Sequence, residues 1–245
     1  MSARGWGRAT PPLLVAHRGA SATEPENTVG AIRAARTAGA DAVEIDVRLC
    51  RTGEVVVFHD EDLGRMAKVP MRVADLGFEA LRDLDLGHRE RVPTLDEILE
   101  EAGRDLLVDV EIKAETARDL GLEAKTAAIL RRHDVGPRVC VSSFHPAALW
   151  RFRRQMPEVP SGIIFADDQV LPLRRAWFAP LLGVGLLAAQ STLCDPATVH
   201  AWHGRGYAVL AWTVDDPDEA AALAAAGVDA LAANDPARVR GALGL

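Results

Sequence analysis

Short apolar runs alternate with longer amphipathic stretches along almost the whole chain, and this alternation restricts the fold more than any other feature. Stretches with helical spacing include Thr28–Ala38, Leu120–His133, Pro146–Gln155 and Pro217–Ala226. The apolar runs predict nine strands, over Leu13–His17, Ala42–Arg48, Val55–His59, Leu106–Lys113, Val139–Phe144, Gly162–Phe165, Gly185–Gln190, Ala208–Val214 and Ala230–Asn234. Strands that alternate with helices form βα units around a parallel sheet.

The connection between the second and third runs is too short for a parallel crossover, which needs a dozen or more residues. We therefore expect a hairpin with a two-residue turn at Thr52-Gly53, a register that places Asp46 opposite His59. Eight parallel strands remain, the number in a (β/α)8 TIM barrel. We predict an α/β fold: a single barrel domain over 12–245, with a short hairpin extension after the second strand and an N-terminal tail over 1–11.

Composition excludes several other classes of protein. Of 245 residues, 49% are apolar and 26% are charged, which is typical of a folded domain. The net charge of −7 argues against nucleic-acid binding, which needs a broad basic surface. The chain shows no signal peptide and no run long enough for stable membrane insertion, and its three scattered cysteines suit a reducing compartment. We expect a cytoplasmic protein, and the sequence leaves its oligomeric state open.

Glu44 and Asp46 lie two residues apart in the second predicted strand. Residues at i and i+2 share one face of a strand, so the two carboxylates point to the same side. Two such charges repel each other unless a cation or a proton lies between them. An acidic edge strand is the simpler alternative, but a divalent metal held by oxygen ligands explains the pair better.

The fourth predicted strand repeats this pattern with Asp109, Glu111 and Lys113. A buried ion pair between Glu111 and Lys113 is one interpretation. The other is a third metal carboxylate from Glu111, with Lys113 beside it to meet an anion. The second interpretation fits the first acidic pair, because barrel enzymes gather their sites at the carboxyl ends of the strands.

His17-Arg18-Gly19 follows the first strand, and His59-Asp60 follows the third. A guanidinium can grip a phosphate or carboxylate, and an imidazole can move protons near neutral pH. A polar loop is the alternative explanation for His17-Arg18-Gly19. The predicted hairpin register brings His59 beside Asp46, so that two imidazoles surround one cation. Such a pair suits a reaction in which one proton is removed and another is delivered.

Phe144 and Trp212 also stand where predicted strands end. Aromatic residues at such positions are usually part of the core. They could instead form the walls of a small pocket and pack the organic part of a substrate.

The ordered set of motifs resembles the glycerophosphodiester phosphodiesterase family over about residues 12–240. No single motif is specific, but their order and approximate spacing are. The matching residues are His17-Arg18-Gly19, Glu26-Asn27-Thr28, Glu44-x-Asp46, His59-Asp60, Glu111-x-Lys113, Ser143-Phe144 and Trp212-Thr213-Val214.

This resemblance implies a barrel enzyme that hydrolyses glycerophosphodiesters to an alcohol and glycerol 3-phosphate. It implies one divalent metal ion, Mg²⁺ or Ca²⁺ with Mn²⁺ also suitable, held by Glu44, Asp46 and Glu111. The resemblance makes His17 and His59 the acid/base pair. It also implies phosphate contacts from Arg18 and Lys113, and a site edge shaped by Glu26 and Asn27.

The chain departs from the family pattern in places that concern the substrate. Arg65 alone matches the family's Arg-Thr-Thr-like element, the stretch over Leu84–Val92 is short, and Ala233-Asn234-Asp235-Pro236 replaces a usual Thr-Asp-x-Pro. A small cap could admit bulkier diesters, so a lysophospholipid or another lipid-headgroup diester is the alternative substrate of the same site. A phosphate- or metal-binding barrel without activity is the non-enzymatic alternative, and a metal-free barrel isomerase is a third.

Overall fold

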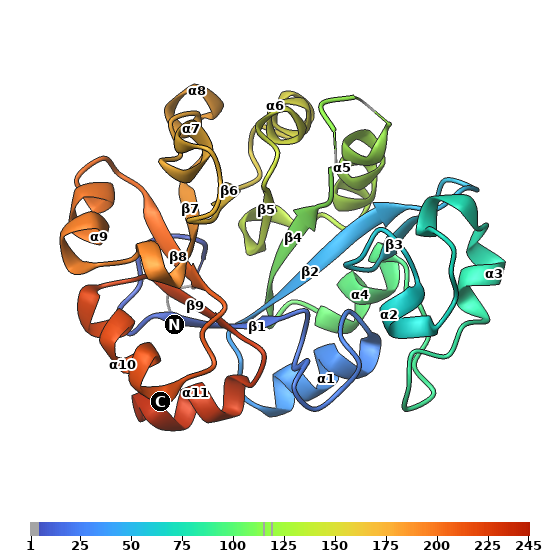
Figure 1. The fold of residues 1–245 in the computed structure, drawn as a ribbon, viewed down its shortest axis with the longest axis horizontal. Helices are drawn as coiled ribbons and strands as arrows, with labels where there is room; N and C mark the ends of the chain where they lie inside the picture. The colour runs from blue at the N-terminus through green and yellow to red at the C-terminus, as the bar shows by residue number, and fades with distance from the viewer. Residues whose placement is uncertain (1–4, 115, 119) are drawn as a thin grey trace.

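A closed ring of parallel strands surrounded by helices forms the fold (Figure 1). The computed structural model describes residues 5–114, 116–118 and 120–245, so the first four residues of the expected tail lie outside it. Within these residues the strands pair in the order β1-β9-β8-β7-β6-β5-β4-β2-β3, and β1 also pairs with β2. That last pairing closes eight parallel strands into the predicted TIM barrel.

The nine strands and the four helical stretches named from the sequence occur close to their predicted positions. The strands are β1 (Leu13–His17), β2 (Ala42–Leu49), β3 (Val55–Val57), β4 (Leu107–Ile112), β5 (Val139–Ser143), β6 (Ser161–Phe165), β7 (Leu186–Gln190), β8 (Ala208–Trp212) and β9 (Ala230–Ala233). The helices are α1 (Val29–Thr37), α2 (Gly64–Ala67), α3 (Phe78–Arg82), α4 (Leu95–Ala102), α5 (Leu122–Arg132), α6 (Pro146–Gln155), α7 (Leu171–Arg174), α8 (Ala179–Leu182), α9 (Pro196–His203), α10 (Pro217–Ala226) and α11 (Pro236–Leu243).

The predicted register of the β2–β3 hairpin is wrong by one residue. Val47 lies opposite Val57, and the Phe58 amide donates to the Asp46 carbonyl at 2.9 Å, so Phe58 and not His59 is opposite Asp46. The turn holds three residues instead of two, and its last residue, Gly53, has φ +94°. A left-handed residue in third position is typical of three-residue hairpin loops. The extra loop residue shifts every pairing that follows.

Small and medium apolar side chains fill the inside of the barrel. Leu13, Val15, Ala42 and Leu210 are among them, and Trp6 packs at the amino-terminal end, where its indole donates to the Arg138 carbonyl at 3.0 Å. Outward-facing strand residues such as Val43 and Ile45 pack under the helices. The apolar filling lies below the polar residues at the carboxyl ends of the strands, and a cavity opens there.

The β2–β3 hairpin and the residues that follow it form a small separate layer beside the barrel mouth, called the hairpin layer below. Its core consists of Cys50, Val56, Phe58, Leu63, Val73, Leu81, Leu86 and Val92. The layer returns to the barrel at α4, whose N-terminus has a capping box between Thr94 and Glu97. Among the described residues, no helix has the length and apolar character to cross a membrane.

Candidate active site

Three carboxylates from two neighbouring strands meet at the mouth of the barrel. The parallel register places Glu44 beside Asp109 and Asp46 beside Glu111. One oxygen from each of Glu44, Asp46 and Glu111 lies within 4.8 Å of the others, and all three side chains are buried. The alternation of β2 and β4 therefore brings together the acidic residues that the sequence placed on one face of each strand.

Lys113 lies against this cluster. Its Nζ is 2.8 Å from Asp46 Oδ1 and 2.6 Å from Glu111 Oε1. Burial opposes ionisation of Asp46, but the charges of Lys113, His59 and Arg18 outweigh it and hold the pKa of Asp46 below its usual range. Burial raises the pKa of Glu111 to about 7 and, with Asp46 nearby, raises the pKa of Glu44 well above its usual range. The ammonium group of Lys113 therefore does not fully offset the cost of ionising all three carboxylates together.

The donor set fits a hard divalent cation. Glu44 Oε1 is buried and has no hydrogen-bond partner among the described residues, which is costly for a carboxylate oxygen. Three convergent carboxylates supply the oxygen ligands that Mg²⁺ and Ca²⁺ prefer. A bound cation would satisfy the unpartnered oxygen and remove the repulsion that raises the pKa values of Glu44 and Glu111.

His17 lies at the end of β1, with Nε2 3.9 Å from Glu44 Oε2. Its Nδ1 is 2.8 Å from Asn234 Oδ1. The amide nitrogen of Asn234 donates to Asp215 Oδ2 at 2.6 Å, and a carboxylate can only accept, so Asn234 presents its oxygen to His17. Nδ1 of His17 therefore carries the proton. Burial, and then the charge of Arg18, lowers the pKa of His17.

His59 lies just beyond β3, and its carbonyl accepts from Arg48 Nε at 2.9 Å and Arg48 Nη2 at 2.7 Å. Its Nδ1 is 2.7 Å from Asp60 Oδ1, so this nitrogen donates to the carboxylate. Burial lowers the pKa of His59, while the charge of Asp46 opposes that shift. Both imidazoles line one cavity and use Nδ1 for outer partners, which leaves each Nε2 for a ligand.

Arg18, Glu26 and Asn27 form the edge of the cluster. Arg18 Nη1 donates to Glu26 Oε1 at 2.9 Å, and its Nε lies 3.5 Å from Asp46 Oδ2. Asn27 makes two hydrogen bonds to Asp46. Its Nδ2 donates to Asp46 Oδ2 at 2.8 Å, and its Oδ1 accepts from the Asp46 backbone amide at 3.1 Å. Gly19 allows this tight turn, since a Cβ at its position would lie 2.6 Å from the Cβ of Ala31.

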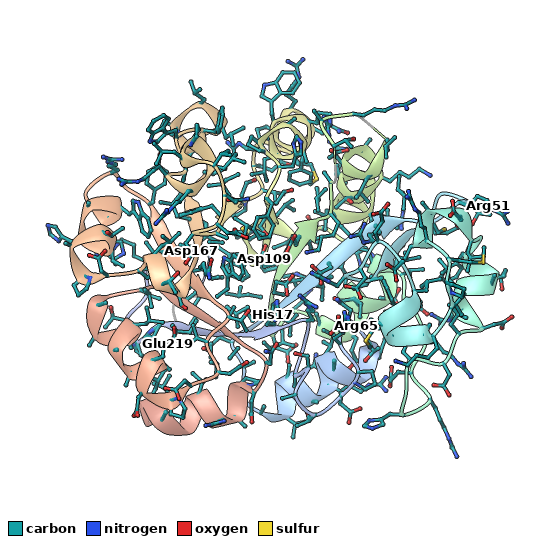
Figure 2. All side chains as sticks on the ribbon, viewed as in Figure 1. His17, Arg51, Arg65, Asp109, Asp167 and Glu219 are labelled. Atoms are coloured by element: carbon teal, nitrogen blue, oxygen red, sulfur yellow. The ribbon has the colours of Figure 1, made fainter. Side chains whose placement is uncertain are left out.

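The catalytic cavity has a volume of about 130 Å³. Its polar side is formed by His17, Arg18, Glu44, His59, Asp109, Glu111 and Lys113, and its apolar side by Phe144, Ile164, Ala188, Leu210, Trp212 and Ala232. Phe144 and Trp212 meet edge to face, with ring centroids 5.5 Å apart. Both aromatic side chains lie on the cavity wall. Figure 2 shows His17 and Asp109, from the polar side, near the middle of the strand ring.

A wider groove of about 330 Å³ lies next to this cavity and shares Lys113 with it. Leu49, Val73 and Leu122 form part of its apolar wall, and Arg72 lies at the same groove. The groove runs between the hairpin layer and the first turn of α5, so it gives a larger ligand room outside the barrel mouth.

The sequence interpretation missed the residues that hold the two histidines. Asn234 follows β9 and Asp215 follows β8, where barrel enzymes place functional groups, so this rule could have identified both. Asp60 and Arg65 form a second such set. Arg65 Nε donates to Asp60 Oδ2 at 2.7 Å and its Nη1 to Glu26 Oε2 at 2.9 Å, which ties the hairpin layer to the β1 loop. No local spacing predicts that last contact.

Known proteins are similar to this chain in sequence and in fold. Residues 17–238 match the model of the glycerophosphoryl diester phosphodiesterase family. A glycerophosphodiester phosphodiesterase from Caldanaerobacter subterraneus is 32% identical over 233 residues, which cover 91% of this chain and 94% of the relative.

Solved structures agree with these matches. A putative glycerophosphoryl diester phosphodiesterase from Silicibacter pomeroyi superposes with a TM-score of 0.88 at 26% identity, covering 98% of this chain and 95% of that one. A phosphodiesterase from Oleispira antarctica, solved with the product sn-glycerol-3-phosphate, superposes with a TM-score of 0.85 at 28% identity and covers 96% and 98%. The chain belongs to the glycerophosphoryl diester phosphodiesterase family.

Proposed function

We propose that the protein hydrolyses glycerophosphodiesters to an alcohol and glycerol 3-phosphate. The observation that carries this proposal is the pair of imidazoles, each with Nδ1 bonded to an outer partner, on one cavity that also presents a buried cluster of three carboxylates and two cationic side chains. Binding alone does not require two proton carriers, so the pair argues against a site that only binds phosphate or metal. The names of the relatives and the product bound to the Oleispira antarctica enzyme support the same reaction.

Glu44, Asp46 and Glu111 are the residues that would hold one divalent cation, Mg²⁺ or Ca²⁺, with Mn²⁺ as a further possibility. Such an ion, when bound, neutralises a non-bridging phosphate oxygen and stabilises charge in the transition state. Asn27 holds Asp46 in place through two hydrogen bonds. Arg18 and Lys113 supply further positive charge for the phosphate oxygens.

His17 and His59 exchange protons with the substrate. One imidazole takes the proton of the nucleophile at Nε2, and the other donates a proton to the oxygen of the leaving alcohol. The Asp60 carboxylate stabilises the charged form of His59, whereas His17 has only the neutral amide of Asn234 as its Nδ1 partner. His59 is therefore the imidazole better equipped to carry positive charge.

Two nucleophiles are compatible with this geometry. A neighbouring glycerol hydroxyl would form a cyclic phosphate, which water then opens with the roles of the histidines reversed. Water could instead attack directly. Rapid-quench analysis separates the two routes, since only the first passes through a cyclic phosphate that can be trapped.

The cavity is smaller than the groove beside it, so we assign a small part of the substrate to the cavity and a larger part to the groove. The cavity of about 130 Å³, with Phe144 and Trp212 on its apolar side, suits the glycerol part of the substrate. The groove beside Lys113 has room for the other ester group, and its apolar wall keeps a lysophospholipid or a similar lipid-headgroup diester as the second candidate substrate.

Product analysis tests the proposed reaction. Purified protein with Mg²⁺, Ca²⁺ or Mn²⁺ should convert glycerophosphocholine or glycerophosphoethanolamine to glycerol 3-phosphate and the free alcohol, followed by ³¹P NMR. Lysophosphatidylcholine, assayed in parallel, decides between the two substrate classes. Failure to cleave any of the three diesters with each of the three metals would contradict the proposal.

A further inference from the structure

Six large apolar side chains lie exposed on neighbouring segments of the barrel's outer face. Within the described residues only nine large apolar side chains are exposed, so two thirds of them gather here. The six, called the α6–α8 patch below, are Trp150, Val170, Leu171, Trp177, Phe178 and Leu181. Helix α8 contacts α6, and Figure 1 shows α6, α7 and α8 on the same edge of the molecule. Isolated exposed apolar residues are ordinary, but a concentration of this kind indicates a contact surface.

Arginines accompany the patch, and the nearest acidic residues before its main run are Asp167 and Asp168. Arg174 and Arg175 are exposed between Leu171 and Trp177, and the exposed Arg154 guanidinium lies 4.9 Å from the centre of the Trp150 ring. The sequence from 169 to 194 contains no Asp or Glu. Residues 135–194 hold six arginines and three acidic residues, a net charge of +3 in a chain whose net charge is −7.

This chemistry matches an anionic lipid surface better than a second copy of the chain. Tryptophan, phenylalanine and leucine next to arginine are typical of segments that lie in the membrane interface. A two-fold symmetric dimer would bring the patch against its own copy, so that the arginines of both copies would gather in one interface with few acidic residues to offset them. We propose that the α6–α8 patch docks the protein reversibly on an anionic lipid surface.

The patch begins near the catalytic end of the barrel. Val170 and Leu171 follow shortly after Phe165, where β6 ends, and the carboxyl ends of the strands carry the cavity. Docking through this face brings the rim of the mouth close to the lipid headgroups. The inference rests on exposure and charge alone and does not depend on the proposed activity.

Vesicle sedimentation with the full chain tests the proposal. We expect binding to vesicles made of equal parts phosphatidylcholine and phosphatidylglycerol, and little binding to phosphatidylcholine alone. Salt should weaken the binding, since the arginines act through screened charge. The double variants Trp177→Ser/Leu181→Ser and Arg174→Glu/Arg175→Glu should each weaken it by about tenfold or more.

Matched controls alter exposed residues elsewhere. Met71→Ser removes an exposed apolar side chain, and Arg51→Glu/Arg89→Glu reverses two exposed charges outside the patch. Figure 2 places Arg51 at the edge of the molecule beyond α3. Both controls should bind like the wild type, and circular dichroism should show every variant folded.

Two results would overturn the proposal. The first is wild-type protein that does not bind the anionic vesicles at low salt, or patch variants that bind them as tightly as the wild type. The second is self-association in sedimentation velocity that Trp177→Ser/Leu181→Ser abolishes, without any binding to vesicles. Hydrolysis of small soluble diesters is measured separately, so failure of the docking proposal leaves the proposed function standing.

Discussion

His17 Nδ1 donates to Asn234 Oδ1 at 2.8 Å, and this bond decides which nitrogen of His17 faces the cavity. Asn234 is itself oriented, because its backbone and side-chain nitrogens both donate to the Asp215 carboxylate. Ser21 also donates to Asn234 Oδ1, at 2.9 Å. Residues after β8 and β9 thus prepare the imidazole at the end of β1 to exchange a proton at Nε2.

Replacing His17 tests its role in proton transfer. His17→Ala should lower turnover by roughly 10²–10⁴, the usual contribution of a general acid or base. His88→Ala is the matched control, because His88 is exposed and pairs with Glu24 outside the cavity. Steady-state kinetics on glycerophosphocholine give the comparison. A His17 variant with full turnover would remove this residue from the mechanism.

The pH dependence of activity should reflect the buried imidazoles. Burial lowers the pKa of both His17 and His59, so each stays neutral at pH values where an exposed histidine is already protonated. The midpoint of the acidic limb in the pH profile of kcat/KM should therefore lie below the ordinary histidine pKa of about 6.5. Asp60→Asn should move the limb that His59 controls to lower pH, since the hydrogen bond that His59 donates to the Asp60 carboxylate raises the pKa of His59.

Asp62→Asn is the control for this profile, because the exposed Asp62 side chain only accepts from the Gly64 amide. An acidic limb well above the ordinary value would contradict the account. So would a profile that Asp60→Asn leaves unchanged.

Lys113 should stabilise the metal-free protein. Lys113→Met leaves the buried Asp46 and Glu111 without their nearest cation, and breaking a buried pair costs roughly 3–5 kcal/mol. Added metal should recover part of this loss. Urea unfolding with and without Ca²⁺ measures both effects, with Lys125→Met as the control, since the exposed Lys125 donates only to the Gly53 carbonyl. Equal losses in the two variants would show that Lys113 does not offset the buried carboxylates.

Metal binding should raise the melting temperature more at high pH than at low pH. Burial raises the pKa of Glu111 to about 7, whereas its unfolded value is about 4.3. The folded state therefore holds a proton that the unfolded state releases, and this group's contribution to the free energy of unfolding falls as the pH rises from about 4 through 7. A metal ion must displace that proton, so it stabilises most above the folded pKa.

Thermal melts at about pH 5.5 and about pH 8 with added Mg²⁺ or Ca²⁺ measure this difference. Glu111→Gln should abolish the metal-induced increase. Asp109→Asn is the matched control, because burial also raises the pKa of Asp109 to about 7 but Asp109 is not among the three clustered carboxylates. A metal-induced increase in melting temperature that is the same at both pH values, or that persists in Glu111→Gln, would contradict the assignment of Glu111 as a metal ligand.

The barrel could be predicted from the sequence because local patterns determine it. Alternating apolar runs and helices, the capping box at Thr94 and Glu97, and the short loop at Gly53 are all local signals. The face shared by Glu44 and Asp46 follows from strand alternation alone. Local signals alone therefore predicted that these two carboxylates point to the same side of their strand.

Contacts between distant segments could not be predicted in the same way. The hairpin register depends on whether the turn holds two or three residues, which Thr52-Gly53 does not decide, and the error displaced His59 from its expected partner. The bond between His17 and Asn234 joins β1 to β9 through barrel closure. The contact of Arg65 with Glu26 depends on how the hairpin layer folds back over the β1 loop.

Hydrolysis of glycerophosphocholine before and after metal removal tests the central claim most directly. The rate of glycerol 3-phosphate release should fall to background in EDTA, because the buried carboxylates of Glu44, Asp46 and Glu111 would lack their cation. Adding Mg²⁺, Ca²⁺ or Mn²⁺ in excess of the chelator should restore the rate. Undiminished hydrolysis in EDTA would contradict the account.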